Sequence, residues 1–278
     1  MRERTMFDYA QLVLRNRVYV SPSAQEKIRS ARLLIAGCGM GSYLAEMAVR
    51  VGFRDITLVD GDSVEVHNLN RQTYVAADVG HPKVKGLAAR LRAINPDARI
   101  RDLACWVDET NAEQLVAESD IVFDTIDFLS LTGLVALHDA CRRLRKPTLS
   151  ALNIGWGAGL LYFPPGGTCS FRRLFGLPET GLPASASYAA YFEPVVRRMA
   201  RHLNPRVTVA LGEVMKLMAE NRPCPAPQVS GGAAAVAALG MTAVVKILEG
   251  EPIRVAPEMI LLDLDAFCNA PGVDLLRD

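Results

Sequence analysis

The length, composition and charge of the chain describe an ordinary globular protein. It has 278 residues, of which 50% are hydrophobic and 22% charged, enough for one large domain or for one domain with an appended subdomain. The 31 Lys and Arg residues nearly balance the 30 Asp and Glu residues. A net charge of +1 provides no basic field for nucleic acid, and no apolar run reaches the roughly 18 residues of a membrane span. We therefore expect neither a DNA partner nor a membrane partner.

Cysteine usage favours a reduced compartment. The six cysteines are scattered along the chain and form no C-x-x-C pair. This spacing argues against a disulfide framework and against a structural zinc site. The N-terminal segment has basic residues but no apolar stretch of the kind found in a secretory signal. Together these features predict a cytoplasmic protein without zinc.

Apolar periodicity predicts alternating strands and helices over the first half of the chain. After a helical lead-in at residues 1–30, we expect a core at residues 31–155, with strands at Arg32–Gly37, Asp55–Asp60, Arg99–Cys105, Asp120–Asp127 and Thr148–Leu152, and helices at Ser42–Val51, Pro82–Ile94, Asn111–Glu118 and Leu131–Arg145. This order favours an α/β fold, a doubly wound, Rossmann-like and mostly parallel sheet with helices on both faces. Ligands of such sheets bind at the carboxyl ends of the strands.

The second half, residues 156–278, is less regular. Proline clusters bracket a mainly helical insertion at about residues 177–223, followed by a small-residue helix over Gly231–Glu249 and a late strand in Met259–Phe267. We interpret this part as a substrate and dimerisation region.

A glycine-rich turn follows the first expected strand. Gly37, Gly39 and Gly41 let a phosphate approach the backbone N–H groups at the start of the next helix. Asp60, at the end of the second strand, stands where a ribose hydroxyl is hydrogen-bonded. Alone, this pattern indicates a dinucleotide site or a tight turn without a ligand.

The polar residues after Asp60 change that interpretation. Arg and Lys offset charge that develops on phosphate oxygens, and a carboxylate such as Asp127 suits Mg²⁺, which prefers oxygen ligands. Phosphoryl or nucleotidyl transfer uses this combination and hydride transfer does not. The set comprises Asp60, Asp62, Asn68, Arg71, Gln72, Lys83, Lys85, Asp124 and Asp127.

These segments resemble the ThiF/MoeB/HesA group, which is related to ubiquitin-activating enzymes. The resemblance lies in QEKIRSARLLIAGCG, ITLVDGDSVEVHNLNRQ, VGHPKVKGLAARLRAINPDARI and IVFDTID. It implies MgATP binding and adenylation of a substrate carboxylate, with Asp60 on the ribose, Asp127 near the metal, and Asn68, Arg71, Gln72 and Lys83 around the phosphates.

The resemblance also implies a homodimer and further residues. An N-terminal arginine would reach the partner's ATP, with Arg17 preferred over Arg15, and a solvated helix end is the equal alternative for this pair. Cys224 lies near the place where some relatives carry a nucleophilic cysteine, but a partly buried structural cysteine is the favoured interpretation. The chain departs from the family pattern in its GCGMGS loop, which is one residue shorter, in the missing zinc pairs and in the 177–223 insertion.

The sequence therefore favours an ATP-dependent adenylyltransferase. Its substrate would be the C-terminus of a protein or peptide, or a small acid, activated for attack by a sulfur, amine or internal nucleophile. An NAD(P)-dependent oxidoreductase and a catalytically silent binding module are the alternatives.

Overall fold

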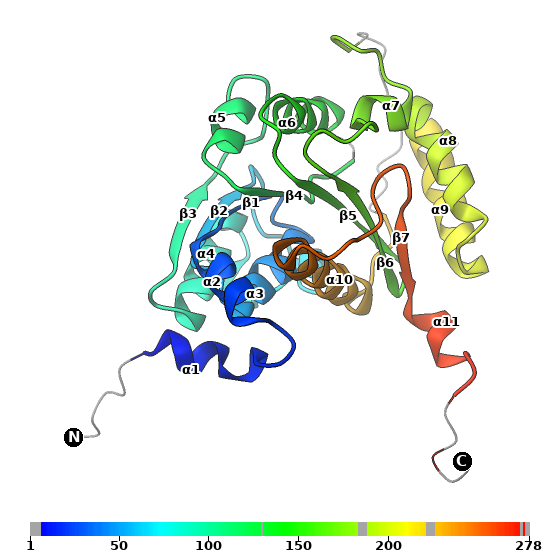
Figure 1. Ribbon diagram of the computed structural model, residues 1–278. Coiled ribbons are helices and arrows are strands. Elements are labelled where there is room, and N and C mark those ends of the chain that lie inside the picture. Colours follow the sequence, from blue (N-terminus) through cyan, green and yellow to red (C-terminus); the bar gives the residue numbers. More distant parts are fainter. Residues whose placement is uncertain (1–6, 129, 183–187, 221–225, 273–274, 276–278) are drawn as a thin grey trace.

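A twisted seven-stranded sheet organises the part of the chain that the structure describes. The computed structural model describes residues 7–128, 130–182, 188–220, 226–272 and 275. The strands are β1 (Arg32–Ala36), β2 (Asp55–Val59), β3 (Arg99–Leu103), β4 (Ile121–Asp124), β5 (Thr148–Ile154), β6 (Gly157–Phe163) and β7 (Ile260–Asp263). They lie in the order β3-β2-β1-β4-β5-β6-β7 (Figure 1).

Strands β1 to β5 are parallel, whereas β6 and β7 are antiparallel to their neighbours. The strand order reverses between β1 and β4, and a crevice forms at such a switch point outside the carboxyl ends of the strands. The expected doubly wound, mostly parallel sheet is confirmed.

Helices cover both faces of the sheet (Figure 1). On one face lie α2 (Pro22–Ser30), α3 (Gly41–Val51), α4 (Lys83–Ile94) and α10 (Ser230–Glu249), and on the other α5 (Ala112–Ala117) and α6 (Leu131–Arg143). Alternate residues of β1 supply both cores: Leu33 and Ile35 join the first cluster, Leu34 and Ala36 the second. Burial on both faces explains why β1 is a continuous apolar run.

The N-terminal residues fasten the C-terminal end of α3. This segment comprises α1 (Tyr9–Val13) and a 3₁₀ turn at Leu14–Asn16. The Tyr9 hydroxyl donates to the carbonyl of Gly52 at 2.9 Å, and the Asn16 side chain donates to the carbonyl of Val51 at 2.9 Å. The helical lead-in is thus bonded to the helix whose other end faces the glycine turn.

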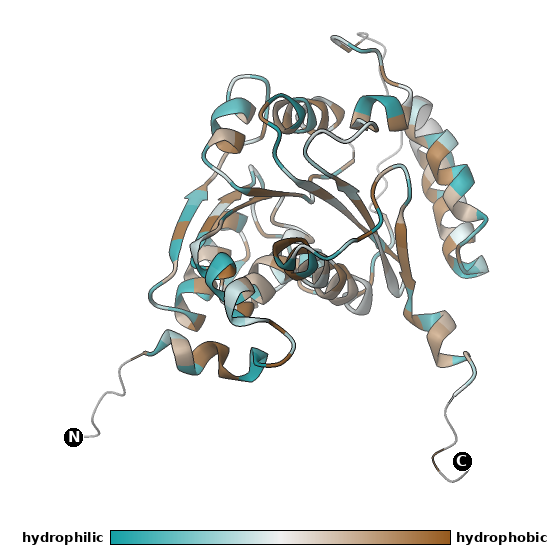
Figure 2. Cartoon of the chain, in the orientation of Figure 1, coloured by the Kyte–Doolittle hydropathy of each residue, from teal (hydrophilic) through white to brown (hydrophobic). Residues whose placement is uncertain are grey.

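The expected helical insertion is confirmed, as two amphipathic helices beside the β7 edge of the sheet. They are α8 (Tyr188–Ala200) and α9 (Pro205–Ala219), preceded by the short α7 (Phe171–Phe175). Figure 2 shows brown and teal faces alternating along α8 and α9. The Phe175 and Phe192 rings stack at 4.1 Å and join α7 to α8. A last helix, α11 (Leu264–Cys268), follows β7.

One helix in the described part of the chain, α10, is long and apolar enough to cross a membrane. Core helices of soluble proteins meet the same test. Half of its apolar window is buried, and the helix packs against α3, β5 and β6. Its apolar surface therefore belongs to the core.

Candidate active site

A cavity of about 810 Å³ opens at the carboxyl ends of the strands, across the switch point between β1 and β4. Strand ends bring Gly37, Asp60 and Asp127 to its wall. Most of the candidate residues predicted from the sequence line it together: Gly37, Gly39, Asp60, Asp62, Asn68, Arg71, Gln72, Lys83 and Asp127.

The glycines of the turn have different surroundings. Gly37 has φ +90°, and a Cβ atom there would lie 2.3 Å from the carbonyl oxygen of Thr125. A Cβ atom on Gly41 would lie 2.6 Å from the Thr125 hydroxyl, and Gly41 is not part of the cavity wall. At Gly39 the nearest atom would be the flexible Gln72 amide at 3.3 Å. Packing therefore demands glycine at 37 and 41, whereas Gly39 faces the cavity.

Helix α3 begins directly after this turn, at Gly41. No side chain caps its first turn. The N-terminal N–H groups of a helix attract anions, since they lack partners within the helix and stand at the positive end of the helix dipole. The one-residue-shorter loop thus still places a helix N-terminus beside the cavity.

Asp60 is buried and holds the turn in place. One carboxylate oxygen accepts a hydrogen bond from the Cys38 N–H at 2.6 Å, and the other accepts from the Asp62 N–H at 2.8 Å. Burial raises the pKa of Asp60 above its ordinary value, and the positive charge of Lys83 opposes that rise. A carboxylate offers about four acceptor positions, so Asp60 keeps capacity for a ligand hydroxyl.

Lys83 is a buried cation at the first residue of α4. Its Nζ pairs with the Asp62 carboxylate at 2.7 Å, and its backbone N–H donates to the Asp62 carbonyl at 2.9 Å. The Lys83 side chain is 9% exposed and that of Asp62 50%. Asp62 thus holds the ammonium group at the cavity wall, where it can contact a phosphate.

Asn68 and Gln72 are buried on the loop between β2 and α4. The Asn68 side-chain oxygen Oδ1 accepts a hydrogen bond from the Glu65 N–H at 3.0 Å, which fixes the loop. The Gln72 Oε1 atom is buried and accepts no hydrogen bond from the described residues. An unsatisfied buried acceptor is costly, so this atom marks a place for a ligand donor.

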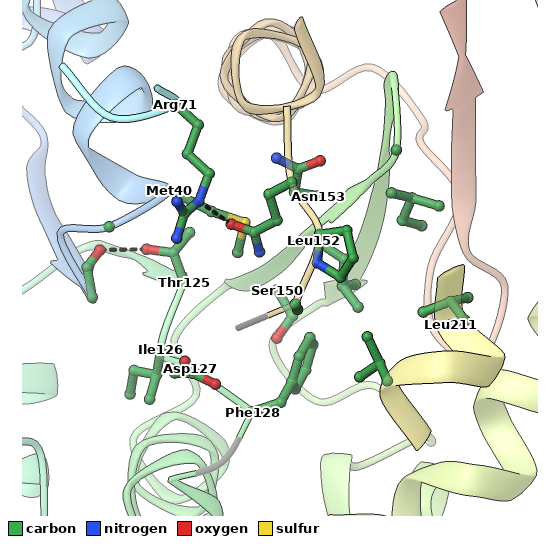
Figure 3. A pocket seen from close by; sticks show the side chains of 18 of the residues that line it. Met40, Arg71, Thr125, Ile126, Asp127, Phe128, Ser150, Leu152, Asn153 and Leu211 are labelled. Carbon is green, nitrogen blue, oxygen red and sulfur yellow. Dashed lines mark hydrogen bonds between the residues drawn. The ribbon is translucent and has the colours of Figure 1, made fainter. Parts of the chain in front are cut away.

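Arg71 connects its own loop to the segment before α10 at the cavity wall (Figure 3). Its Nε donates to the Gln228 side chain at 2.5 Å, and one terminal nitrogen donates to the carbonyl of His67 at 3.0 Å. Burial lowers the pKa of Arg71, and the charge of Asp127 opposes the change. Gln228, which sequence reasoning missed, ties the segment before α10 to this arginine.

A buried polar cluster lies behind the loop that carries Asp127. The Asp124 Oδ2 atom accepts from the Ser150 hydroxyl at 2.5 Å and lies 2.9 Å from His138 Nε2. Its Oδ1 accepts from the Ile126 N–H at 3.2 Å. The cluster therefore joins β4, β5 and α6 and braces the residues just before Asp127. Sequence reasoning singled out Asp124 but missed its two partners.

Two tryptophans also reach the cavity wall. Trp106 is 57% exposed and covers Gly61, where a Cβ atom would lie 2.5 Å from the indole. Trp156 is 50% exposed, lies in the β5–β6 turn and covers Gly231 in the same way. The position of Trp106 shortly after β3 was the sequence signal for its place in the cavity wall.

Other candidates are placed elsewhere. Arg17 is exposed on the N-terminal segment and is not part of the cavity wall. Cys224 lies outside the described residues. The five described cysteines are free thiols. Among the described residues, no group of three or more His, Cys, Asp or Glu side chains is arranged to hold a metal ion.

The chemistry available here is anion binding beside carboxylates. Two cations, Arg71 and Lys83, and a helix N-terminus stand on one side of the cavity, while Asp127 stands at the end of β4. This set can hold a polyphosphate and, through Asp127 and phosphate oxygens, a magnesium ion, since Mg²⁺ is commonly bound by one or two carboxylates plus phosphates.

Comparisons with known proteins identify relatives of the chain. The chain is 33% identical over 165 residues to the SAMP-activating enzyme E1 of Haloferax volcanii, covering 58% of this chain and 60% of that protein. It is 33% identical over 186 residues to the sulfur carrier protein ThiS adenylyltransferase of Bacillus subtilis, covering 65% and 54%. The match thus spans somewhat over half the length of these relatives.

Solved structures share the fold. Escherichia coli MccB in complex with ATP superimposes with a TM-score of 0.67 at 22% identity, covering 92% of this chain and 68% of that one. PaaA superimposes with a TM-score of 0.66 at 19% identity, covering 95% and 82%. The profile of the ThiF family matches residues 13–268. The chain belongs to the ThiF family.

Proposed function

We propose that the protein is an ATP-dependent adenylyltransferase that activates a substrate carboxylate. A carboxylate oxygen attacks the α-phosphorus of ATP, the bond from that phosphorus to the oxygen bridging to the β-phosphate breaks, and pyrophosphate leaves as the acyl-adenylate forms. The observation that carries the proposal is the gathering of Asp60, Arg71, Lys83 and Asp127 around one cavity beside the glycine turn.

Each residue has a role that its surroundings support. Asp60 binds the ribose with its remaining acceptor positions. Arg71 and Lys83 offset the charge of the phosphates, and Asn68 and Gln72 complete the polar wall, where the unpartnered Gln72 Oε1 accepts a donor from the nucleotide. Gly39 lets the phosphates approach the backbone, and Gly37 and Gly41 shape the turn that makes this possible.

Magnesium fits the donor set. Asp127 is exposed to the cavity, and a single carboxylate together with phosphate oxygens and waters is a common Mg²⁺ environment. Mg²⁺ would neutralise charge on the phosphates as pyrophosphate leaves.

A protein or peptide C-terminus, or a small acid, would supply the carboxylate. Two relatives support the first class by name: one is an adenylyltransferase of the sulfur carrier ThiS, and MccB has been solved with MccA. The second nucleophile would be a sulfur, an amine or an internal group. Cys224 stays a candidate from the family resemblance, and Ala226, Pro227 and Gln228, which come shortly after it in the chain, line the cavity.

A cytoplasmic homodimer is the proposed setting. The described cysteines are free thiols, as in reduced compartments. Val18 and Tyr19, which follow Arg17, are 95% and 86% exposed, an apolar surface that a second subunit would cover.

The two alternatives explain less. An NAD(P)-dependent oxidoreductase uses the glycine turn and Asp60 but leaves Arg71, Lys83 and Asp127 without a task, and the named relatives favour adenylation. A catalytically silent binding module would keep the cavity but would not turn over a substrate. Only a measured rate of ATP–pyrophosphate exchange distinguishes it from an enzyme.

Arg71→Ala tests the proposed function. Because Arg71 acts on charge that grows in the transition state, we expect ATP–pyrophosphate exchange to fall about 10²–10³-fold while the affinity for MgATP changes far less. Exchange is measured with candidate peptides and small acids, and binding by calorimetry. Arg143→Ala, at the exposed end of α6, is the matched control.

Three further arms complete that experiment. Removing Mg²⁺ with a chelator should abolish exchange, and Cys224→Ser should leave exchange intact but stop transfer if the thiol is the second nucleophile. Absence of MgATP binding to the unmodified protein would end the adenylation proposal, and tight binding of a nicotinamide cofactor would replace it with the oxidoreductase.

A further inference from the structure

We propose that α8 and α9 form an apolar chamber that selects an acid with a bulky apolar group beside its carboxylate. The chamber is the part of the cavity that lies past Phe128 and is lined by α7, α8, α9, β5 and β6. The inference deepens the proposed adenylation function and rests on it. Neither the family membership nor the nucleotide residues define this substrate class.

The wall formed by α8 is apolar at helical spacing. Phe192, Val195, Val196 and Met199 follow the i, i+3, i+4, i+7 pattern of one helix face, and all of them line the cavity. Phe192 and Met199 are 2% and 9% exposed. The opposite face of α8 carries exposed charged residues such as Glu193. The inner face therefore belongs to the cavity and the outer face to solvent.

The wall formed by α9 repeats the pattern. Val207, Ala210, Leu211 and Val214 have the same i, i+3, i+4, i+7 spacing and also line the cavity. These side chains are half-buried, because they border the cavity instead of being covered by protein. Val209, on the outer face of the same helix, is 64% exposed. An amphipathic helix whose apolar face borders a cavity offers that face to a ligand.

Two contacts hold the N-terminal end of α9 in place. A Cβ atom on Gly155 would lie 2.7 Å from a methyl carbon of Val207, so the β5–β6 turn touches the helix. The Asn204 side chain donates to the Asp265 carboxylate at 2.5 Å, which joins the start of α9 to α11. The wall that α9 forms is therefore joined by direct contacts to the rest of the fold.

The sheet supplies the opposite wall. Leu152 and Ile154 of β5 and Leu161 of β6 line the chamber, and Figure 3 shows Phe128, Leu152 and Leu211 around the same space. Phe128 directly follows Asp127 in the chain. The apolar chamber thus begins one residue from the carboxylate proposed for the metal.

The distribution of charge orients the substrate. Arg71 and Lys83 stand on the nucleotide side, whereas the spaced residues of α8 and α9 named above are all apolar. The ionisable side chains that line the cavity near these helices are Arg206, at the start of α9, and Asp263 and Asp265, at the β7–α11 junction. Moving a carboxylate into apolar surroundings costs free energy because it loses its hydration. The substrate carboxylate would therefore remain on the nucleotide side of the cavity. The apolar body then fills the chamber, where each added methylene should strengthen binding about fourfold.

The test compares two substitutions on one helix. Leu211→Asp places a charge in the chamber, and Val209→Asp places the same charge on the outer face of α9. Calorimetry measures the binding of 4-phenylbutanoic acid, butanoic acid, and acetylated tripeptides that end in Phe or Asp. Each is measured with and without a non-hydrolysable ATP analogue. Exchange rates with the same acids follow.

We expect the apolar acid or the Phe-ending peptide to bind to the unmodified protein. Leu211→Asp should weaken that binding about tenfold or more, whereas Val209→Asp should leave it unchanged. The affinity for MgATP should stay the same in both variants. Preference for the free acid or for the peptide distinguishes the two sources of the same chemistry. Ala210→Phe, which fills the chamber without a charge, should exclude the larger acid and keep the smaller one.

Three results would overturn the inference while leaving adenylation intact: MgATP binds but no apolar acid does, polar acids are bound as well as apolar ones, or Leu211→Asp and Val209→Asp behave alike. Loss of MgATP binding in the unmodified protein would instead count against the proposed function itself.

Discussion

Two glycines of the turn after β1 differ in what a side chain would meet there. Gly37→Ala forces a Cβ atom to within 2.3 Å of the Thr125 carbonyl at a φ of +90°. The left-handed backbone costs about 1–2 kcal/mol and the forced contact about 1–3 kcal/mol more. We expect unfolding by urea to report a loss of about 2–5 kcal/mol.

Gly39→Ala is the matched control for that change. Its Cβ atom would meet only the Gln72 amide at 3.3 Å, which can shift. The free energy of unfolding should change little, while the affinity for MgATP falls because the methyl group projects into the cavity. Equal losses of stability in the two variants would contradict the division between a structural and a ligand-facing glycine.

The residues of the site were predictable from the sequence where they belong to a motif. Gly37, Gly39, Asp60, Arg71 and Lys83 line one cavity, as the motifs that contain them suggested. The Asp62–Lys83 ion pair, the unpartnered Gln72 Oε1 and the Arg71–Gln228 bond were not predictable, because each depends on how loops far apart in the sequence meet.

Asp120 directly precedes strand β4 and Asp124 ends it. The two aspartates should contribute unequally to the free energy of unfolding. Asp124→Ala removes the shared acceptor of buried His138 and Ser150, which should cost about 3–5 kcal/mol. Asp120→Ala removes an exposed bond to Arg32, worth about 1 kcal/mol or less. Denaturant unfolding measures both losses, and a smaller loss at Asp124 than at Asp120 would show that the buried cluster does not brace the strand.

Elements were predictable where periodicity was strong. The five parallel strands and their helices follow the expected order, because the central strands β1 and β4 are apolar runs buried on two faces. The antiparallel pairing of β6 with β5 and β7 was not predictable, because the local sequence of a strand does not show whether it pairs parallel or antiparallel to its neighbour. The two insert helices were expected, but the cavity that they border depends on their tertiary placement.

At the scale of the whole molecule, the proposed homodimer makes Arg17 a residue of its partner's site. Mixing Arg17→Ala protein with Arg71→Ala protein should then restore exchange to about a quarter of the unmodified rate, because half of the random dimers contain one intact site. Light scattering establishes the dimer, and Arg15→Ala serves as the neighbouring control. A mixture no more active than its components would place Arg17 outside the partner's site.

The division of the cavity has a consequence for how such a protein changes over evolutionary time. The residues proposed for ATP come from the stretch between Gly37 and Asp127, whereas the chamber is lined by residues that follow it in the chain. A mutation at Leu211 or Ala210 therefore alters which acid is accepted without touching the groups that hold the phosphates. New specificities can arise in the insertion while the older chemistry is inherited unaltered.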